Sequence, residues 1–290
     1  MTTLLIFFTY LVAALVLSAL LFFPVFQAVN AIWEIRPDRV FYRLAMFIAI
    51  AGFWPCIRIL GINNLDSIGY SLAPAQFLRI CAKGLGVGVV IMLVHATLLV
   101  LLGARVPEPG ELHFSELLQP VITGLISGIL VAFIEETFFR GAMYHHMRRH
   151  SHVWTTLIIT SLFYAAVHFM RPSIPAGGLI IDWSSGFTML LSMLHQYKEF
   201  ADIADSFVAL FFAGLFLGLV RERSGNIALC IGIHAGWVLI IKLAGELTEV
   251  DHQSTMNFLI GDYDGIIGWA ATGILVLATL GYWSYGRIKR

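Results

Sequence analysis

The sequence predicts an all-α, polytopic transmembrane helix bundle with about eight spans. Of its 290 residues, 59% are hydrophobic and only 12% are charged, which is about half the charged fraction of an ordinary soluble domain. The mean hydropathy is +0.84, as in chains whose apolar surface faces acyl chains. We therefore expect a single integral membrane domain over residues 1–290, embedded in a lipid bilayer.

The expected spans are apolar runs of about 20 residues, the length that crosses the hydrocarbon core. The first run lacks a basic leader and is too long for the apolar part of a signal peptide, so we expect it to be retained. Pro55 and Arg58 interrupt the second run, and the sixth is short. The stretch 174–205, rich in Gly, Ser and acids, is expected to be re-entrant or interfacial. In chain order the runs cover residues 4–29, 44–62, 84–104, 118–139, 153–170, 206–220, 226–243 and 264–284.

The basic residues are divided unevenly between the two sides of such a bundle. With eight spans both termini share one side, and that side holds eleven of the 18 Lys and Arg residues. Because an excess of Lys and Arg marks the cytoplasmic side, we expect both termini in the cytoplasm. The chain shows no eukaryotic retention signal, so a bacterial cytoplasmic membrane is expected. A net charge of zero argues against a nucleic-acid partner.

Two adjacent carboxylates, Glu135 and Glu136, lie near the end of the fourth run, and Arg140 follows them. An ionisable residue inside a span is costly unless it is paired or lines a wet cavity, so it is a functional candidate. Glu136 and Arg140 are four residues apart and share a helix face, whereas Glu135 points about 100° away. We expect Arg140 to neutralise one glutamate and the other to serve in proton transfer. A helix-end ion pair at the membrane surface is the simpler alternative.

Two histidines, His168 and His234, interrupt the fifth and seventh runs. A lone His in a span is more often a packing residue, as we expect for His95. Counted from the nearest polar rim residues at 1.5 Å per residue, Glu136, His168 and His234 lie about 18, 24 and 16 Å deep. This similar depth favours a common site between the fourth, fifth and seventh helices.

Glycines at a spacing of four residues occur on three of the runs. This spacing allows two helix backbones to approach closely. We therefore expect tight helix packing at Gly124 and Gly128, Gly214 and Gly218, and Gly232 and Gly236.

The polar residues belong to three short motifs. The chain reads E-E-x-x-x-R, then aromatic-x-x-x-H, then a His in a later run, at Glu135, Glu136, Arg140, Tyr164, His168 and His234. In this order they resemble the motifs of the membrane-embedded CAAX prenyl protease and bacteriocin-processing family, also called the Abi family. Tyr164 stands in place of the family's Phe, and Val238 in place of the Asn four positions after the last His. The resemblance covers a catalytic-like core of about residues 118–240, between N-terminal spans in 1–104 and a C-terminal span at 264–284.

The resemblance implies intramembrane hydrolysis of a peptide bond by a glutamate-activated water, without a metal cofactor. Glu135 would be the general base, and His168 would help to hold and polarise the water. Glu136 and Arg140 would form an orienting ion pair. His234 would donate a hydrogen bond to the oxyanion of the tetrahedral intermediate.

Val238 departs from the family motif in a way that affects this mechanism. The family's Asn helps to stabilise the oxyanion by a hydrogen bond, and Val cannot donate one. Three alternatives follow: another group replaces the Asn as a hydrogen-bond donor, the proteolytic activity is weaker, or the protein is no longer a protease. Asn226, two helical turns before His234, is a candidate substitute. A peptide or membrane-protein substrate is expected in place of a prenylated one.

The sequence is also compatible with three other hypotheses. A zinc ion held by Glu135, Glu136, His168 and His234 is chemically reasonable, although the zinc motif H-E-x-x-H is absent from the sequence. A proton-coupled transporter is an alternative because Glu and His relays also mark pumps. A non-catalytic membrane scaffold or immunity protein is the third possibility.

Overall fold

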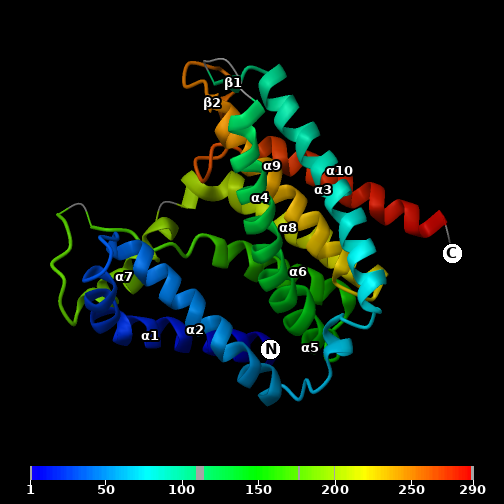
Figure 1. The fold of residues 1–290 in the computed structure, drawn as a ribbon. Helices are drawn as coiled ribbons and strands as arrows, with labels where there is room; N and C mark the ends of the chain where they lie inside the picture. Colours follow the sequence, from blue (N-terminus) through cyan, green and yellow to red (C-terminus); the bar gives the residue numbers. More distant parts are fainter. Residues whose placement is uncertain (1, 109–113, 176, 199, 289–290) are drawn as a thin grey trace. The chain divides into compact units, whose positions relative to one another are not determined.

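The computed structural model describes residues 2–108, 114–175, 177–198 and 200–288, and these are predominantly α-helical (Figure 1). This confirms the predicted all-α class. Within the described residues, six helices are long and apolar enough to cross a membrane: Thr3–Asn30, Pro37–Ile59, Pro74–Leu101, Leu117–Arg148, Phe200–Ser224 and Ala228–Leu247. The chain is a multi-pass membrane protein.

The two other expected spans are also helical. The fifth run forms α6 (Val153–His168), a shorter apolar helix of 16 residues. The eighth forms α10 (Trp269–Ile288), whose second half carries Trp, Ser and Tyr and is less apolar. α10 is therefore not among the six candidate spans.

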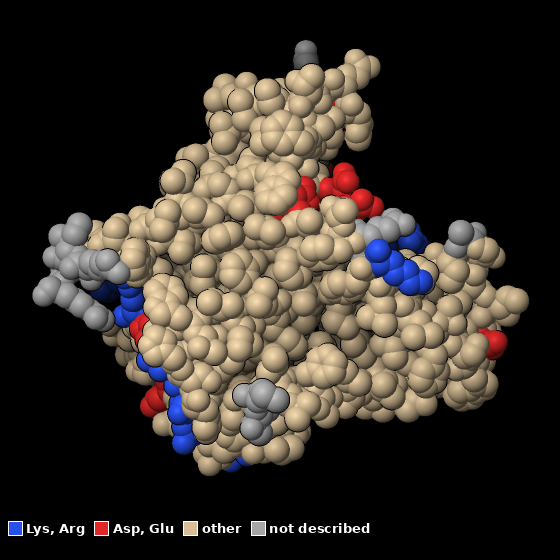
Figure 2. Space-filling model, turned by 180° about the vertical axis from the view of Figure 1, so that it is seen from behind, with Lys and Arg blue, Asp and Glu red and all other residues tan. Residues whose placement is uncertain are grey.

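The surface of the protein matches a lipid environment. Figure 2 shows a face on which Lys, Arg, Asp and Glu form only small groups among uncharged side chains. Large apolar side chains are exposed on several helices, among them Leu20, Phe47, Leu78, Ile126 and Leu277. Contiguous apolar surface of this kind is rare on soluble monomers, and acyl chains would cover it here.

Contacts between Cα atoms divide the chain into two compact units. One contains residues 1–63 and 166–201, and the other contains residues 64–165 and 202–290. The single integral membrane domain expected from the sequence stays a prediction.

The first unit is built on α1 (Thr2–Asn30) and α2 (Pro37–Ile59), which lie side by side (Figure 1). Part of the stretch expected to be re-entrant or interfacial forms α7 (Ser185–Ser192), which packs on α1. A Cβ atom at Gly186 would lie 2.0 Å from the carbonyl oxygen of Ala19, so only Gly allows this contact. The core consists of Leu15, Ala19, Phe22, Phe26, Val40, Phe41, Ala45, Met189 and Met193.

The second unit contains most of the remaining helices. They are α3 (Pro74–Leu101), α4 (Phe114–Glu136), α5 (Tyr144–Arg148), most of α6, α8 (Phe200–Ser224), α9 (Ala228–Leu247) and α10. A π-helix, η2 (Thr137–Met143), joins α4 to α5. A short 3-10 helix, η1 (Leu65–Ile68), precedes α3. Two short strands, β1 (Arg105–Pro107) and β2 (Thr248–Val250), pair antiparallel with Arg105 opposite Val250.

Helix α9 packs against both α3 and α4 (Figure 1), and glycines make the α3 contact very close. A Cβ at Gly88 of α3 would lie 2.1 Å from the carbonyl oxygen of Ile233, and a Cβ at Gly232 would lie 2.0 Å from that of Cys81. Gly84 and Gly236 extend this contact in both directions. The expected tight packing at Gly232 and Gly236 is thus confirmed, whereas the matching pair on α3 was not expected.

The other two glycine pairs also lie at helix contacts, as predicted. Gly124 and Gly128 of α4 face α9, where a Cβ at Gly128 would lie 2.8 Å from the carbonyl oxygen of Ala235. Gly214 and Gly218 of α8 face Ser161 and Leu157 of α6. These contacts bring α4, α6, α8 and α9 together around the predicted polar residues.

We expect Gly88→Ala to lower the free energy of unfolding by about 1–3 kcal/mol, because the added methyl group overlaps the α9 backbone. Gly86→Ala is the matched control on the same helix, since a Cβ at Gly86 meets no atom within 4 Å. Thermal unfolding of the purified variants in detergent measures the difference. Equal unfolding temperatures for the two variants would show that α3 and α9 do not pack this closely.

Candidate active site

The two glutamates end α4, at the point where the backbone changes from an α-helix to a π-helix. Glu135 and Glu136 are the last residues of α4, and Thr137–Met143 form η2. π segments are rare and frequently lie at functional sites. The helical chain then continues to Arg148.

Glu136 is the centre of the polar cluster, and its side chain is fully buried. Its Oε1 atom accepts a hydrogen bond from Nη1 of Arg140 at 2.9 Å, which is the predicted pair four residues apart. The same oxygen lies 2.8 Å from Nδ1 of His234 on α9. Because a carboxylate can only accept, Nδ1 must carry the hydrogen. One buried oxygen therefore joins α4, η2 and α9.

Glu135 lies on the other side of the His234 ring. Its Oε2 atom is 4.0 Å from Nε2 of His234, and its side chain is 27% exposed, in contrast to Glu136. The distance is too long for a direct hydrogen bond. His234 thus contacts one glutamate through Nδ1 and faces the other with Nε2.

Tyr164 of α6 forms a wall of this cluster. The centre of its ring lies 4.3 Å from the guanidinium carbon of Arg140, a cation–π contact. The same ring meets His234 edge-on at 6.5 Å, and Trp237 lies beside His234 at 6.4 Å. The change from the family's Phe to Tyr keeps this aromatic face. The motif predicts an aromatic residue at Tyr164, but not its contact with Arg140.

His168 and His95 are the other two histidines that interrupt apolar runs. His168 is the last residue of α6, one turn after Tyr164, in the part of α6 that belongs to the first unit. Its part in the site stays a prediction. His95 is buried on α3, and its Nε2 lies 2.9 Å from the carbonyl oxygen of Ile266. It is a packing residue, as expected.

The position of Asn226 does not support a place in the oxyanion site. Its Oδ1 accepts from the backbone N–H of Ala228 at 3.1 Å, and its Nδ2 donates to the carbonyl oxygen of Ser224 at 2.9 Å. The side chain therefore closes the turn between α8 and α9. Val238 packs toward α4, where its Cβ would lie 3.4 Å from a Cβ at Gly128.

Three features of the polar cluster bear on the alternative of a zinc ion, which stays a prediction. Among the residues that the structure describes, no group of three or more His, Cys, Asp and Glu side chains is placed to hold a metal ion. Oε1 of Glu136 already accepts hydrogen bonds from Arg140 and His234. A dication next to the guanidinium would also be repelled.

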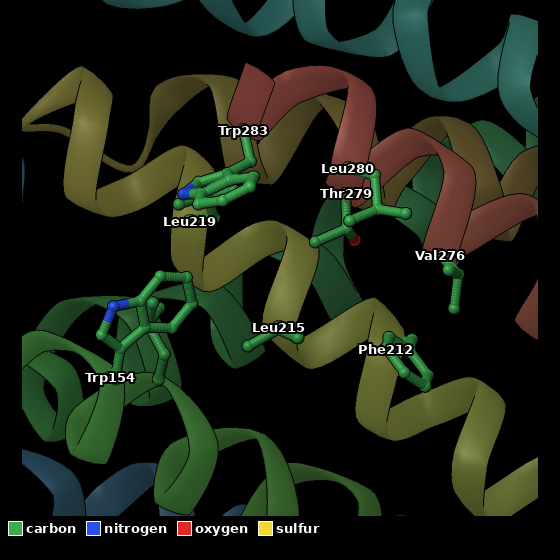
Figure 3. A pocket seen from close by; sticks show the side chains of 9 residues that line it. Trp154, Phe212, Leu215, Leu219, Val276, Thr279, Leu280 and Trp283 are labelled. Atoms are coloured by element: carbon green, nitrogen blue, oxygen red, sulfur yellow. The ribbon is translucent and has the colours of Figure 1, made fainter. Parts of the chain in front are cut away.

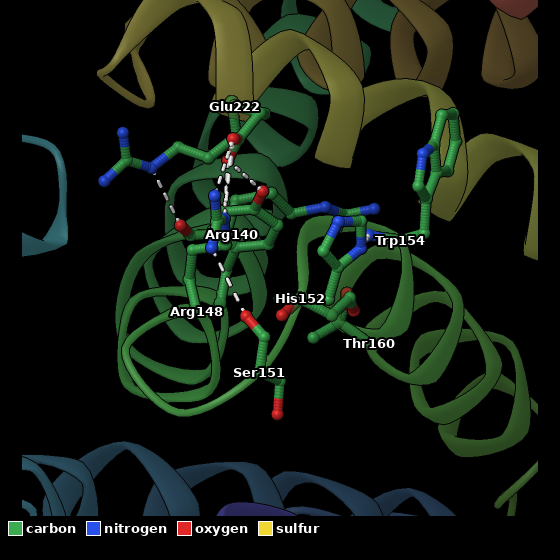
Figure 4. Close-up of polar contacts among 10 residues, drawn as sticks. Arg140, Arg148, Ser151, His152, Trp154, Thr160 and Glu222 are labelled. Carbon is green, nitrogen blue, oxygen red and sulfur yellow. Dashed lines mark hydrogen bonds and ion pairs between the residues drawn. The ribbon is translucent and has the colours of Figure 1, made fainter.

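At the end of the helical chain, charged residues form a second polar contact. Arg148 pairs with Glu222 of α8 at 3.3 Å and donates to the carbonyl oxygen of Ser151 at 3.3 Å (Figure 4). The hydroxyl of Tyr144 donates to the same glutamate.

A groove of about 360 Å³ runs between α6, α8 and α10 in the second unit. Figure 3 shows Trp154 and Trp283 on its sides, together with apolar residues of α8 and α10. None of the predicted site residues is among those that line it. The groove is an apolar surface, distinct from the polar cluster.

Comparison with known proteins agrees with the motifs. Residues 117–240 match the sequence model of the type II CAAX prenyl endopeptidase Rce1-like family, which confirms the family resemblance over this segment. No curated protein and no solved structure gives a significant match. The matched segment contains Glu135, Glu136, Arg140, His168 and His234. Residues 117–240 of this chain are therefore similar to the type II CAAX prenyl endopeptidase Rce1-like family.

Proposed function

We propose that this protein is a membrane-embedded endopeptidase that hydrolyses a peptide bond with a water activated by Glu135. The observation that carries the proposal is the position of His234 between the two glutamates, with Nδ1 2.8 Å from Glu136 and Nε2 4.0 Å from Glu135. The family match supports the class of reaction. The substrate we propose is a peptide or a membrane protein.

The ion pair orients the histidine in this mechanism. Arg140 holds Glu136, and Glu136 accepts from Nδ1 of His234. The ring is thereby fixed with Nε2 toward Glu135. A water that makes hydrogen bonds of about 2.8 Å to both Glu135 Oε2 and His234 Nε2 fits here. Two bonds of this length can bridge the 4.0 Å between these atoms. Glu135 is the more exposed of the two glutamates, which supports its role as the base that receives the water.

The chemical step moves one proton to Glu135 and back. Glu135 takes a proton from the water while the water oxygen bonds to the scissile carbonyl carbon. As the C–N bond breaks, Glu135 returns this proton to the leaving amine. His168, at the end of α6, would help to hold the water.

His234 would stabilise the oxyanion of the tetrahedral intermediate. Since Nδ1–H donates to Glu136, Nε2 can donate to the oxyanion only if His234 enters the reaction as an imidazolium, with a proton already on Nε2 before the water is deprotonated. Because Arg140 already neutralises Glu136, the Glu135 carboxylate near Nε2 would balance that charge. Val238 offers no hydrogen bond, so His234 would carry more of the stabilisation than it would beside an Asn.

The reaction we propose needs no metal ion, because the buried positive charge beside Glu136 is supplied by Arg140. We also infer that the protein lies in a bacterial cytoplasmic membrane with both termini in the cytoplasm. The excess of Lys and Arg on that side supports this orientation.

We expect Glu135→Gln to lower kcat by about 10²- to 10⁴-fold, the usual contribution of a general base. Cleavage of a panel of fluorogenic peptides by purified protein measures it. Glu246→Gln is the matched control, because Glu246 is an exposed residue further along α9. A Glu135→Gln variant as active as Glu246→Gln would contradict the role of Glu135.

Replacing His234 with Phe keeps a ring in place and removes both nitrogen contacts. We expect kcat to fall by about 10²- to 10³-fold, the usual effect of losing one oxyanion donor. The test is the rate of peptide cleavage at saturating substrate, with thermal unfolding as the check on folding. Full activity in a folded His234→Phe protein would remove His234 from the mechanism.

Treatment with a zinc chelator such as 1,10-phenanthroline should leave the cleavage rate unchanged. The reason is that the Arg140 guanidinium, and not a metal ion, neutralises Glu136. The control is the same assay with zinc added back. Loss of activity that zinc restores would favour the metal mechanism instead.

A further inference from the structure

Arg221, in the last turn of α8, is a buried cation that the proposed mechanism does not use. Its Nε donates to the backbone carbonyl oxygen of Arg140 at 3.0 Å. Its Nη2 donates to the carbonyl oxygen of Ser67 in η1 at 3.3 Å. One side chain thus connects α8, the π-helix and the segment before α3, which are far apart in the sequence.

The π-helix explains why the Arg140 carbonyl is available to an outside donor. In an α-helix this carbonyl would accept from the backbone N–H of Tyr144, four residues later. Here that N–H is directed to the carbonyl oxygens of Gly141 and Phe139. The Arg140 carbonyl oxygen therefore accepts a hydrogen bond from the Arg221 guanidinium in place of the Tyr144 N–H.

Helix α8 holds Arg140 at both ends. The guanidinium Nη2 of Arg140 donates to the carbonyl oxygen of Gly214 at 3.4 Å, while Arg221 binds the backbone oxygen of the same residue. Gly214 and Arg221 are seven residues apart, about two helical turns, and so lie on the same face of α8. Helix α8 therefore positions both the backbone and the side chain of Arg140.

Residues 65–70 support the π-helix from the other side. The hydroxyl of Thr137 donates to the carbonyl oxygen of Phe133, so the Tyr70 hydroxyl, 2.5 Å from Thr137 Oγ1, acts as the donor to Thr137. Burial raises the pKa of Tyr70, which keeps that proton on the phenol. A Cβ at Gly141 would lie 3.1 Å from the carbonyl oxygen of Ile68. The segment that Arg221 binds is the segment on which η2 rests.

Gly69 allows this segment to approach the arginine. Its φ of +104° lies in the left-handed region, and a Cβ there would be 2.9 Å from Ile227 and 3.3 Å from the guanidinium carbon of Arg221. The Gly69 carbonyl oxygen accepts from the backbone N–H of Ile227 at 3.2 Å. Arg221 is therefore enclosed between the segment, η2 and the start of α9.

We propose that Arg221 is a positioning residue for the active site. By fastening the π-helix at the Arg140 carbonyl, it sets where the Arg140 guanidinium meets Glu136, and through Glu136 it sets the orientation of His234. The catalytic consequence rests on the function proposed above. The fastening of η2 does not, and it can be measured separately.

The test compares Arg221→Met with Arg223→Met in the full-length protein. Arg223 is two residues further along α8 and also donates to backbone carbonyls, those of Tyr282 and Trp283 in α10. We expect Arg221→Met to lower kcat by about 10- to 100-fold, because small displacements of catalytic groups are costly, with KM unchanged. Arg221→Lys should recover part of kcat, since an ammonium can donate to the same carbonyl. Arg223→Met should keep kcat.

Hydrogen exchange of residues 137–144, followed by mass spectrometry, gives the second readout. We expect faster exchange there in Arg221→Met than in Arg223→Met. The positioning role would be overturned if a folded Arg221→Met protein kept its kcat, whether or not its KM changed. If the wild-type protein cleaves no peptide, the proposed function fails. The inference is then judged by the exchange alone, and equal exchange in the two variants would overturn it.

Discussion

A single buried oxygen, Oε1 of Glu136, organises the polar interior of the second unit. A carboxylate removed from water is strongly destabilising unless it is paired and hydrogen-bonded. Here Arg140 supplies the charge and His234 a second hydrogen bond. Satisfying this oxygen ties η2 and α9 to the end of α4. The same two bonds fix the imidazole with its other nitrogen toward Glu135, so that the requirement for stability is also the arrangement that the proposed chemistry uses.

Close helix packing is what brings His234 within reach of that oxygen. The contact between α3 and α9 depends on glycines in both helices, since added Cβ atoms would overlap the opposite backbone. Gly128 allows α4 to approach α9 near Ala235, next to His234. Tyr164 then covers Arg140 from α6. The polar cluster around Glu136 therefore depends on how closely these helix backbones approach one another.

Much of this arrangement could be predicted from the sequence, because it follows from helical periodicity. The pairing of Glu136 with Arg140, the different direction of Glu135 and the contacts of the three glycine pairs are examples. The π-helix could not be predicted, since it depends on tertiary partners such as Arg221 and Tyr70 that lie far away in the sequence. Asn226 was considered for the site from its distance along a helix, but α9 begins only at Ala228 and Asn226 belongs to the turn. The contact of Tyr164 with Arg140 is likewise a product of the α6 packing.

The most direct test of the central role of Glu136 is a double-mutant cycle with Glu136→Gln, Arg140→Gln and the double variant. Unfolding of each purified protein by SDS gives the four free energies. The shared-oxygen arrangement predicts a coupling between the two residues of about 1–3 kcal/mol, because either single change leaves a buried group without its partner. Additive effects of the two substitutions, within about 0.5 kcal/mol, would contradict it.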